Sequence, residues 1–168
     1  IAREKRSIFS FFDGRQIAVV PAADRYADYL AEGVDGRVVR SSMETAGVER
    51  VVPLGIDGSR LECAEGSIAL RLPGAHMVAN ALAVMTVARL LDIPFAAMRD
   101  GIERVEPVFG RAEVIRGAVT VIQDCYNANP ESMRSALEVL AQSRSPGRRV
   151  AILGAIKELG DQAPARSE

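Results

Sequence analysis

The stretch AVTVIQDCYNANPESM, residues 118–133, passes from an apolar run through a polar loop to a helix start. The run AVTVI is typical of a buried strand, and the small polar residues after it favour a turn. Asn129 before Pro130 indicates the helix start, because an asparagine can cap free amides and proline fits the first helical position. Strand, loop and helix in this order predict an α/β protein, in which ligands bind where strands end.

The preceding segments extend this α/β pattern. A predicted helix over 1–12 leads into the strand QIAVV at 16–20, and a short helix is predicted over 24–30. Four short segments then predict small antiparallel strands, at 37–42, 48–54, 59–65 and 67–73. A long helical pattern covers 76–93, and Pro94 opens a second helix.

The C-terminal third follows a break at 106–114 that contains Pro107 and Gly110. A strand at 118–124, a helix at 130–143 and a strand at 148–154 predict a β-α-β unit with a parallel sheet. We therefore place a domain boundary near Phe109 to Arg111.

Composition narrows the class of protein. The chain has 168 residues, 48% of them hydrophobic and 26% charged, as a soluble globular protein has. Lys and Arg number 21 against 22 Asp and Glu, so charge favours neither nucleic acid nor anionic membrane as a partner. No apolar run is long enough to span a bilayer. With two cysteines and no leader sequence, a cytoplasmic protein is expected, and the start at Ile1 inside a predicted helix indicates a fragment.

Asp124 and Cys125 stand at the expected end of the strand. A carboxylate at Asp124 can bind a ribose hydroxyl, a metal-bound water or a backbone amide, and we favour a functional role over simple turn formation. Cys125 has no histidine nearby in sequence, so a small buried thiol is expected rather than a nucleophile.

His76 and Asn80 are one helical turn apart in the segment LPGAHMVANA. That spacing allows both side chains to contact one ligand. The alternative is that His76 caps the helix and Asn80 bonds locally, and the residues alone leave both possibilities open. A metal site built on the chain's single histidine is not expected.

Lys5 is one of only two lysines beside nineteen arginines. An amine can form a carbamate or act as a nucleophile, whereas a guanidinium does neither. The charged neighbours of Lys5 also fit an ordinary solvated helix face. The sequence contains no G-x-x-x-x-G-K-[ST] phosphate loop, G-x-G-x-x-G, H-E-x-x-H or nucleophile elbow, so the residues predict an α/β ligand-binding protein without specifying a reaction.

Four segments together resemble the Mur ligases of peptidoglycan synthesis. IAREKRSIF is similar to the helix that carries the family's modified lysine, and LPGAHMVANALA to its LPG-x-HN-x-x-NALA segment. EPVFGRAEVI is similar to the P-x-GR-x-E junction of the family. QDCYNANPESM resembles the form found in the member that adds D-alanyl-D-alanine to the UDP-N-acetylmuramoyl tripeptide.

The resemblance implies a role for three residues of the first part of the chain. Lys5 matches the lysine that, as a carbamate, ligates Mg²⁺ and supports catalysis. Asn80 matches the asparagine that contacts the adenine end of ATP, and His76 matches the histidine beside it.

Four residues of the second part also match the family. Arg111 matches the junction arginine that reaches ATP, and Asp124 matches the aspartate that holds the nucleotide. Asn127 and Asn129 are assigned to the substrate side. By this resemblance, residues 1–109 form the back half of the central ATP-binding domain, and 110–168 form the start of a Rossmann-like C-terminal domain.

The implied activity is ATP-dependent amide ligation through an acyl phosphate, with UDP-N-acetylmuramoyl tripeptide and D-alanyl-D-alanine as substrates. This activity would contribute to cell-wall biogenesis, and through it to cell shape and cell division. The enzyme is expected to be monomeric and cytoplasmic. Met77 replaces the usual asparagine after the histidine, and Ala155 replaces a usual aspartate. Without a phosphate-binding loop, the chain by itself is expected to be inactive. The alternatives are a sister Mur or folylpolyglutamate-type ligase and a non-catalytic nucleotide-binding module.

Overall fold

The computed structural model describes residues 2–144 and 147–156. The chain opens with α1 (Ala2–Arg6) and the 3₁₀ helix η1 (Ser7–Phe11). A strand, a helix and a second strand follow: β1 (Ile17–Pro21), α2 (Ala27–Ala31) and β2 (Arg37–Ser41). The predicted helix and strand at the start of the chain are confirmed, and the helix ends in a tighter 3₁₀ turn.

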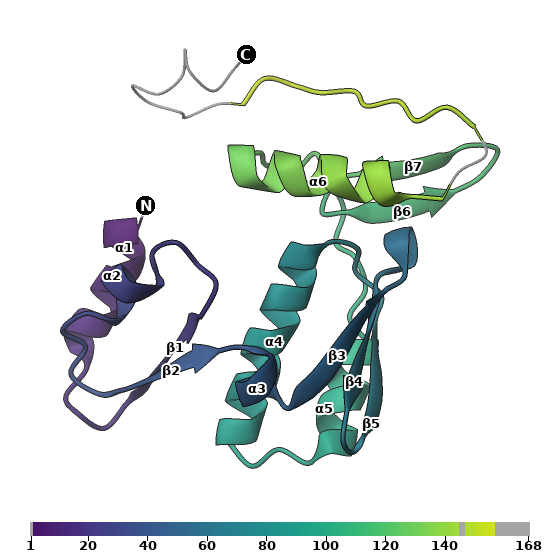
Figure 1. Cartoon of the computed structure of the whole chain (residues 1–168). Coiled ribbons are helices and arrows are strands. Elements are labelled where there is room, and N and C mark those ends of the chain that lie inside the picture. The colour runs from purple at the N-terminus through teal and green to yellow at the C-terminus, as the bar shows by residue number, and fades with distance from the viewer. Residues whose placement is uncertain (1, 145–146, 157–168) are drawn as a thin grey trace.

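β1 and β2 form a two-stranded parallel sheet in which Val19 pairs with Val39. The prediction that 37–42 joins the antiparallel strands was therefore wrong. The α2 crossover explains the difference, because two consecutive strands become parallel when a helix returns the chain to its starting edge. Among the described residues, the parallel pair thus lies near the start of the chain (Figure 1).

The short helix α3 (Met43–Ala46) leads to a three-stranded antiparallel sheet. Its strands are β3 (Val48–Pro53), β4 (Ser59–Cys63) and β5 (Gly66–Leu70), which confirms the prediction for these three segments. The turn between β3 and β4 contains the 3₁₀ helix η2 (Gly55–Asp57). Alternate residues of β4 and β5 are buried, because one face of the sheet packs against helices.

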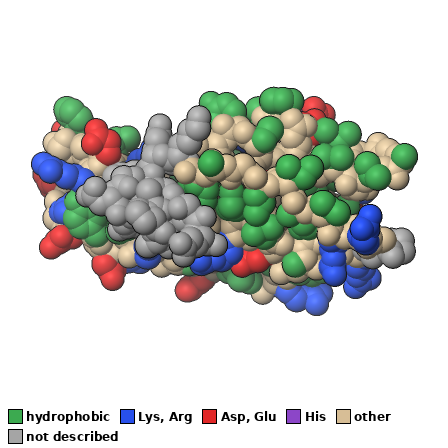
Figure 2. All heavy atoms as spheres, turned by 90° about the horizontal axis from the view of Figure 1, so that it is seen from above, with side chains coloured by type: hydrophobic (Ala, Val, Ile, Leu, Met, Phe, Trp, Pro, Cys, Tyr) green, Lys and Arg blue, Asp and Glu red, His purple; other side chains and the backbone are tan. Residues whose placement is uncertain are grey.

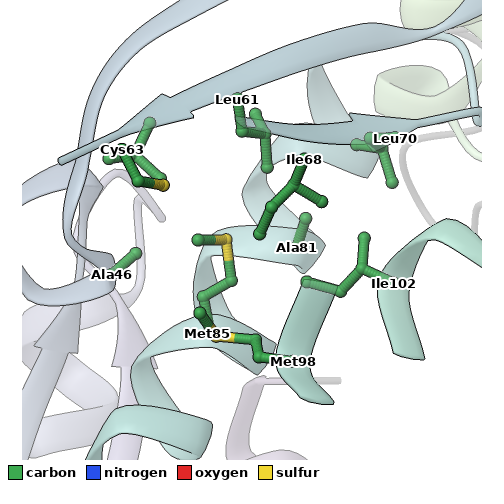
Figure 3. Packing of buried hydrophobic residues seen from close by; sticks show 10 residues of the cluster. Ala46, Leu61, Cys63, Ile68, Leu70, Ala81, Met85, Met98 and Ile102 are labelled. Atoms are coloured by element: carbon green, nitrogen blue, oxygen red, sulfur yellow. The ribbon is translucent and has the colours of Figure 1, made fainter. Parts of the chain in front are cut away.

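Those helices are α4 (Ala75–Leu90) and α5 (Phe95–Glu103), as the helical patterns predict. Leu61 and Ile68 of the sheet meet Met85 of α4, and all three are fully buried. Figure 3 shows these side chains converging between the sheet and the two helices. This core fixes α4 and therefore the position of the His76 segment at its start.

The C-terminal segment contains β6 (Glu113–Arg116), β7 (Thr120–Gln123) and α6 (Pro130–Gln142). The break predicted at 106–114 is partly a strand, because its last residues belong to β6, which pairs with β7 in an antiparallel hairpin. Asn129 caps α6: its side chain accepts from the N–H of Ser132 at 2.8 Å, and the Ser132 hydroxyl accepts from the Asn129 N–H. The predicted helix start is confirmed.

The predicted strand at 148–154 is absent from the described part of the chain, so the β-α-β prediction was wrong. Arg149 gives the physical reason, because its guanidinium donates to the carbonyls of Ala141 and Ser143 at the end of α6. A basic side chain satisfies free carbonyls at a helix C-terminus, and here it ties the chain to the helix end instead of to the edge of β7.

Apolar side chains of the C-terminal segment are consequently exposed, and β7 is not the buried strand that AVTVI predicts. Val119 is 72% exposed and Ile152 is 95% exposed. Figure 2 shows hydrophobic side chains gathered on the face that carries this segment. On its other side, α6 contacts α4 and η2, and Glu131 forms an ion pair with Arg25 at 3.3 Å.

Candidate functional site

Two short segments meet just beyond the ends of the β6–β7 hairpin. The N–H of Tyr126 donates to the carbonyl of Gly110 at 3.0 Å. The N–H of Ala112 donates to a carboxylate oxygen of Asp124 at 3.2 Å. We call residues 110–112 and 124–126 the loop pair, because these two bonds hold the segments together on either side of Arg111.

The bond to Asp124 stabilises an unusual backbone conformation. Ala112 is buried and has a φ of 53°, in the left-handed region that residues with a Cβ seldom adopt. The carboxylate satisfies the N–H of Ala112 in this turn. Of the three partners that the sequence analysis offered for Asp124, the backbone amide is therefore present, and contact with a nucleotide stays a prediction. The Asp124 side chain is otherwise exposed at the strand end.

Arg111 extends from the middle of the loop pair. The centre of its guanidinium lies 4.4 Å from the centroid of the Tyr126 ring, and both side chains are exposed. The contact of Tyr126 with Arg111 is not predictable from the sequence, because a single aromatic residue in a polar loop gives no periodic signal.

Asn127 and Asn129 make local hydrogen bonds. The side-chain oxygen of Asn127 accepts from the N–H of Ala128 at 2.8 Å. Asn129 is used as the cap of α6, and both asparagines are exposed. Their contact with substrate stays a prediction, while the capping role of Asn129 is a complete structural explanation of that residue.

His76 lies in the first turn of α4, but it does not cap the helix. The cap position is Gly74, which has a φ of 104° and no side-chain cap bond. A Cβ at Gly74 would lie 2.8 Å from His76 Cε1 and 3.4 Å from Val139 Cγ2 of α6. Among the described residues, the buried Nδ1 of His76 has no hydrogen-bond partner. The imidazole is thus held near α6, with its Nδ1 buried and unpaired.

Asn80 lies one turn further along α4, and its side chain is exposed. Its amide makes a weak contact with Met77 Sδ at 3.9 Å. Met77 itself packs against the hydrophobic core, so an apolar residue fits this position. Asn80 therefore remains accessible, but no described contact joins it to His76.

Lys5 is exposed on α1. Its neighbour Arg6 anchors this helix by donating to the carbonyl of Glu32 and by stacking over Tyr29. Figure 1 shows α1 on the opposite side of the molecule from β6 and β7. Among the described residues, no hydrogen bond or ion pair joins Lys5 to Arg111 or Asp124.

The two cysteines lie in different environments. Cys125 is exposed, so the prediction of a buried thiol was wrong: the loop after β7 lies on the surface. Cys63 is buried, and burial, with a smaller effect from Glu65, raises the pKa of its thiol. Within residues 2–144 and 147–156, no group of three or more His, Cys, Asp or Glu is placed to hold a metal ion. No helix in the same residues is long and apolar enough to cross a membrane.

Comparison with known proteins identifies the family of the chain. A family model, "Mur ligase, glutamate ligase domain", matches residues 110–168. The UDP-N-acetylmuramoyl-tripeptide--D-alanyl-D-alanine ligase of Treponema pallidum is 40% identical over 161 residues, which are 95% of this chain and 35% of that protein. The chain belongs to the Mur ligase family. It spans about a third of the length of this relative.

Solved structures of Mur ligase relatives share the fold. A crystal structure of MurF from Acinetobacter baumannii has a TM-score of 0.84 and 29% identity, covering 98% of this chain and 37% of that one. The folylpolyglutamate synthase of Mycobacterium tuberculosis, solved with ADP and AMPPCP, has a TM-score of 0.62 and 25% identity, covering 84% of this chain and 34% of that one. The fold of this Mur ligase chain is thus α/β and resembles MurF more strongly than folylpolyglutamate synthase.

The side chains of this Mur ligase chain fit a nucleotide better than they fit a metal ion. Arg111 offers an exposed cation that suits a phosphate, and Asp124 offers an exposed carboxylate that suits a hydroxyl group. For Mg²⁺, Lys5 as a carbamate is one candidate ligand, and the described residues supply no clustered partners for it. Ala155 is exposed, and nothing in the structure explains its replacement of the usual aspartate.

Proposed function

We propose that a complete ligase containing this chain joins D-alanyl-D-alanine to the UDP-N-acetylmuramoyl tripeptide in an ATP-dependent reaction. The loop pair carries this proposal, because it presents Arg111 and Asp124 from two hydrogen-bonded segments at the open end of the β6–β7 hairpin. The relative from Treponema pallidum supports the choice of substrates through its name, and the synthase solved with ADP and AMPPCP supports nucleotide use.

In this reaction the phosphoryl group of ATP passes to the tripeptide carboxylate, and the dipeptide amine then displaces phosphate from the acyl phosphate. Arg111 binds phosphate oxygens through its fixed donors. Asp124 accepts a hydrogen bond from the nucleotide while it holds the turn, and Asn80 with His76 contacts the base. Lys5, if carbamylated, would offer its carbamate oxygens as ligands to Mg²⁺, which would supply positive charge near the phosphate groups. Cytoplasmic location and monomeric state stay predictions.

The test is a ligation assay on the complete ligase with ATP, UDP-N-acetylmuramoyl tripeptide and D-alanyl-D-alanine. We expect Lys5→Ala to abolish activity, and short-chain carboxylic acids to restore part of it by supplying the missing oxygen ligands. Lys5→Arg keeps the charge but forms no carbamate, so it should be as inactive as Lys5→Ala. Arg3→Ala removes an exposed charge from the same helix and serves as the control, with activity close to wild type.

Three outcomes separate the hypotheses. Full activity of Lys5→Arg would refute the carbamate role but leave the ligase assignment intact. A wild-type protein that binds ATP without ligation would instead support the non-catalytic nucleotide-binding module. Ligation of glutamate to a folate, without activity on the muramoyl peptide, would assign the chain to the sister branch.

A further inference from the structure

Among the residues that the structure describes, three arginines lie over tyrosine rings, and Arg111 differs from the other two. The guanidinium of Arg6 is 4.7 Å from the Tyr29 ring, and that of Arg25 is 4.7 Å from the Tyr26 ring. Both of these arginines also form ion pairs, Arg6 with Glu32 and Arg25 with Glu131.

Arg111 has no ion pair with any carboxylate in residues 2–144 and 147–156, although its guanidinium lies only 4.4 Å from the Tyr126 ring. A ring face attracts a cation at this distance without neutralising its charge. The ring therefore orients the guanidinium and leaves its donors available to an anion.

The backbone holds Tyr126 in this place. The N–H of Tyr126 donates to Gly110 O, one residue before Arg111, and Asp124 accepts from the N–H one residue after it. Two hydrogen bonds thus cross between the segments on both sides of the arginine. The relative position of ring and guanidinium is set by the backbone as well as by the weak attraction between them.

Gly110 permits this close approach. It has a φ of +72°, and a Cβ there would lie 3.1 Å from the backbone nitrogen of Tyr126 and 3.3 Å from its Cβ. Such contacts are tighter than a side chain normally accepts, so a residue without a side chain brings the two segments together. The pairing of Arg111 with Tyr126 is therefore built into the turn.

We propose that Tyr126 is a positioning residue that holds the Arg111 guanidinium ready for a phosphate of the nucleotide. This inference rests on the proposed function, because it assigns the anion to ATP. The phenol oxygen has no part in it, so only the ring face is required. Tyr126 acts on the nucleotide through Arg111 and has no direct contact of its own with the base.

The experiment measures the Kd for ATP in the complete ligase for Tyr126→Leu and Tyr126→Phe, each alone and combined with Arg111→Met. Phenylalanine keeps the ring face, and leucine removes it but keeps an apolar side chain. We expect Tyr126→Leu to weaken ATP binding about two- to fivefold, as the loss of one exposed cation–π contact does, and Tyr126→Phe to bind like wild type. In the Arg111→Met background, Tyr126→Leu should have no further effect.

Ligation kinetics supply the second measurement. A positioning role predicts a higher KM for ATP with kcat nearly unchanged in Tyr126→Leu, and rescue of that KM in Tyr126→Phe. If Tyr126→Leu weakens binding equally with and without Arg111, the tyrosine contacts the nucleotide directly and the inference is overturned. An unchanged Kd in Tyr126→Leu also overturns it. If the wild type binds ATP with the expected pattern of variants but does not ligate, Tyr126 keeps its role and only the proposed function fails.

Discussion

The turn between β3 and β4 contains two glycines, Gly55 and Gly58, at which an alanine substitution should affect stability very differently. Gly58 has a φ of 97° and a ψ of −134°, which only glycine adopts readily. A Cβ there would lie 1.9 Å from the carbonyl oxygen of Leu70, at the end of β5. Gly55 has a φ of +65°, and a Cβ there would meet nothing within 4 Å.

Gly58→Ala should destabilise the chain strongly. The backbone conformation costs about 1–3 kcal/mol for a residue with a Cβ. In addition, a carbon and an oxygen in contact prefer a separation above about 3 Å, so the end of β5 must move by more than about 1 Å. Because Leu70 is buried in the core, that movement adds roughly 1–3 kcal/mol of packing loss. We expect a total loss of about 3–5 kcal/mol in the free energy of unfolding.

Urea unfolding followed by far-ultraviolet circular dichroism measures this loss, with Gly55→Ala as the matched control. Gly55→Ala pays only for a left-handed backbone, about 1 kcal/mol. The expected difference between the variants is therefore about 2–4 kcal/mol. Equal stability of the two variants would show that the Leu70 carbonyl oxygen does not lie in contact with Gly58, and would refute this packing of β5 against the turn. A displaced β5 also shifts the segment that leads to His76, so ATP binding by the complete ligase should weaken in Gly58→Ala alone.

Two further predictions concern the helix cap and an ion pair. Asn129→Ala should lower the free energy of unfolding by about 1 kcal/mol, because the N–H of Ser132 loses its partner. Asn129→Asp keeps a capping oxygen and should retain the stability of wild type. Equal melting curves for all three proteins would exclude the cap as a stabilising element. The ion pair joins Glu65 to Arg89, and the hydrogen bond from Arg89 lowers the pKa of the Glu65 carboxyl in the folded chain. The ion pair therefore stabilises the fold above the pKa of the unfolded chain, about 4.3, and this stabilisation is lost as the pH falls through the lower pKa of the folded chain. Urea unfolding from about pH 7 to about pH 3 should show a higher free energy of unfolding for wild type than for Glu65→Gln at neutral pH, and equal values for the two proteins in acid. A difference that does not change with pH would contradict this role of Glu65.

Local sequence signals account for much of the secondary structure. The periodicity of 76–93 predicts α4, and the alternation around Leu61 and Ile68 predicts two antiparallel strands. Asn129 and Pro130 mark the start of α6 before any tertiary contact is known. These signals succeed because the residues that cause each structure are neighbours in the chain, and the alternating pattern of a strand states directly which face is buried.

The errors concern strand pairing, which depends on segments distant in sequence. The segment 37–42 has the same local pattern as an antiparallel strand, and only the α2 crossover places it parallel to β1. The segment 148–154 has the composition of a strand, yet Arg149 binds the end of α6 and no ladder forms. Exposure of Cys125 likewise follows from where the loop after β7 lies, which its own residues do not encode.

The sequence by itself determined the family, through four motifs in order, and the identities of Lys5, His76, Asn80, Arg111 and Asp124 as candidate site residues. Only the tertiary structure decided how they are arranged. It joins Asp124 to Ala112, places Tyr126 beside Arg111, and leaves Lys5 exposed on α1. The physical reason is that a motif specifies chemical groups, whereas distances between groups follow from hydrogen bonds and packing that close loops across the chain.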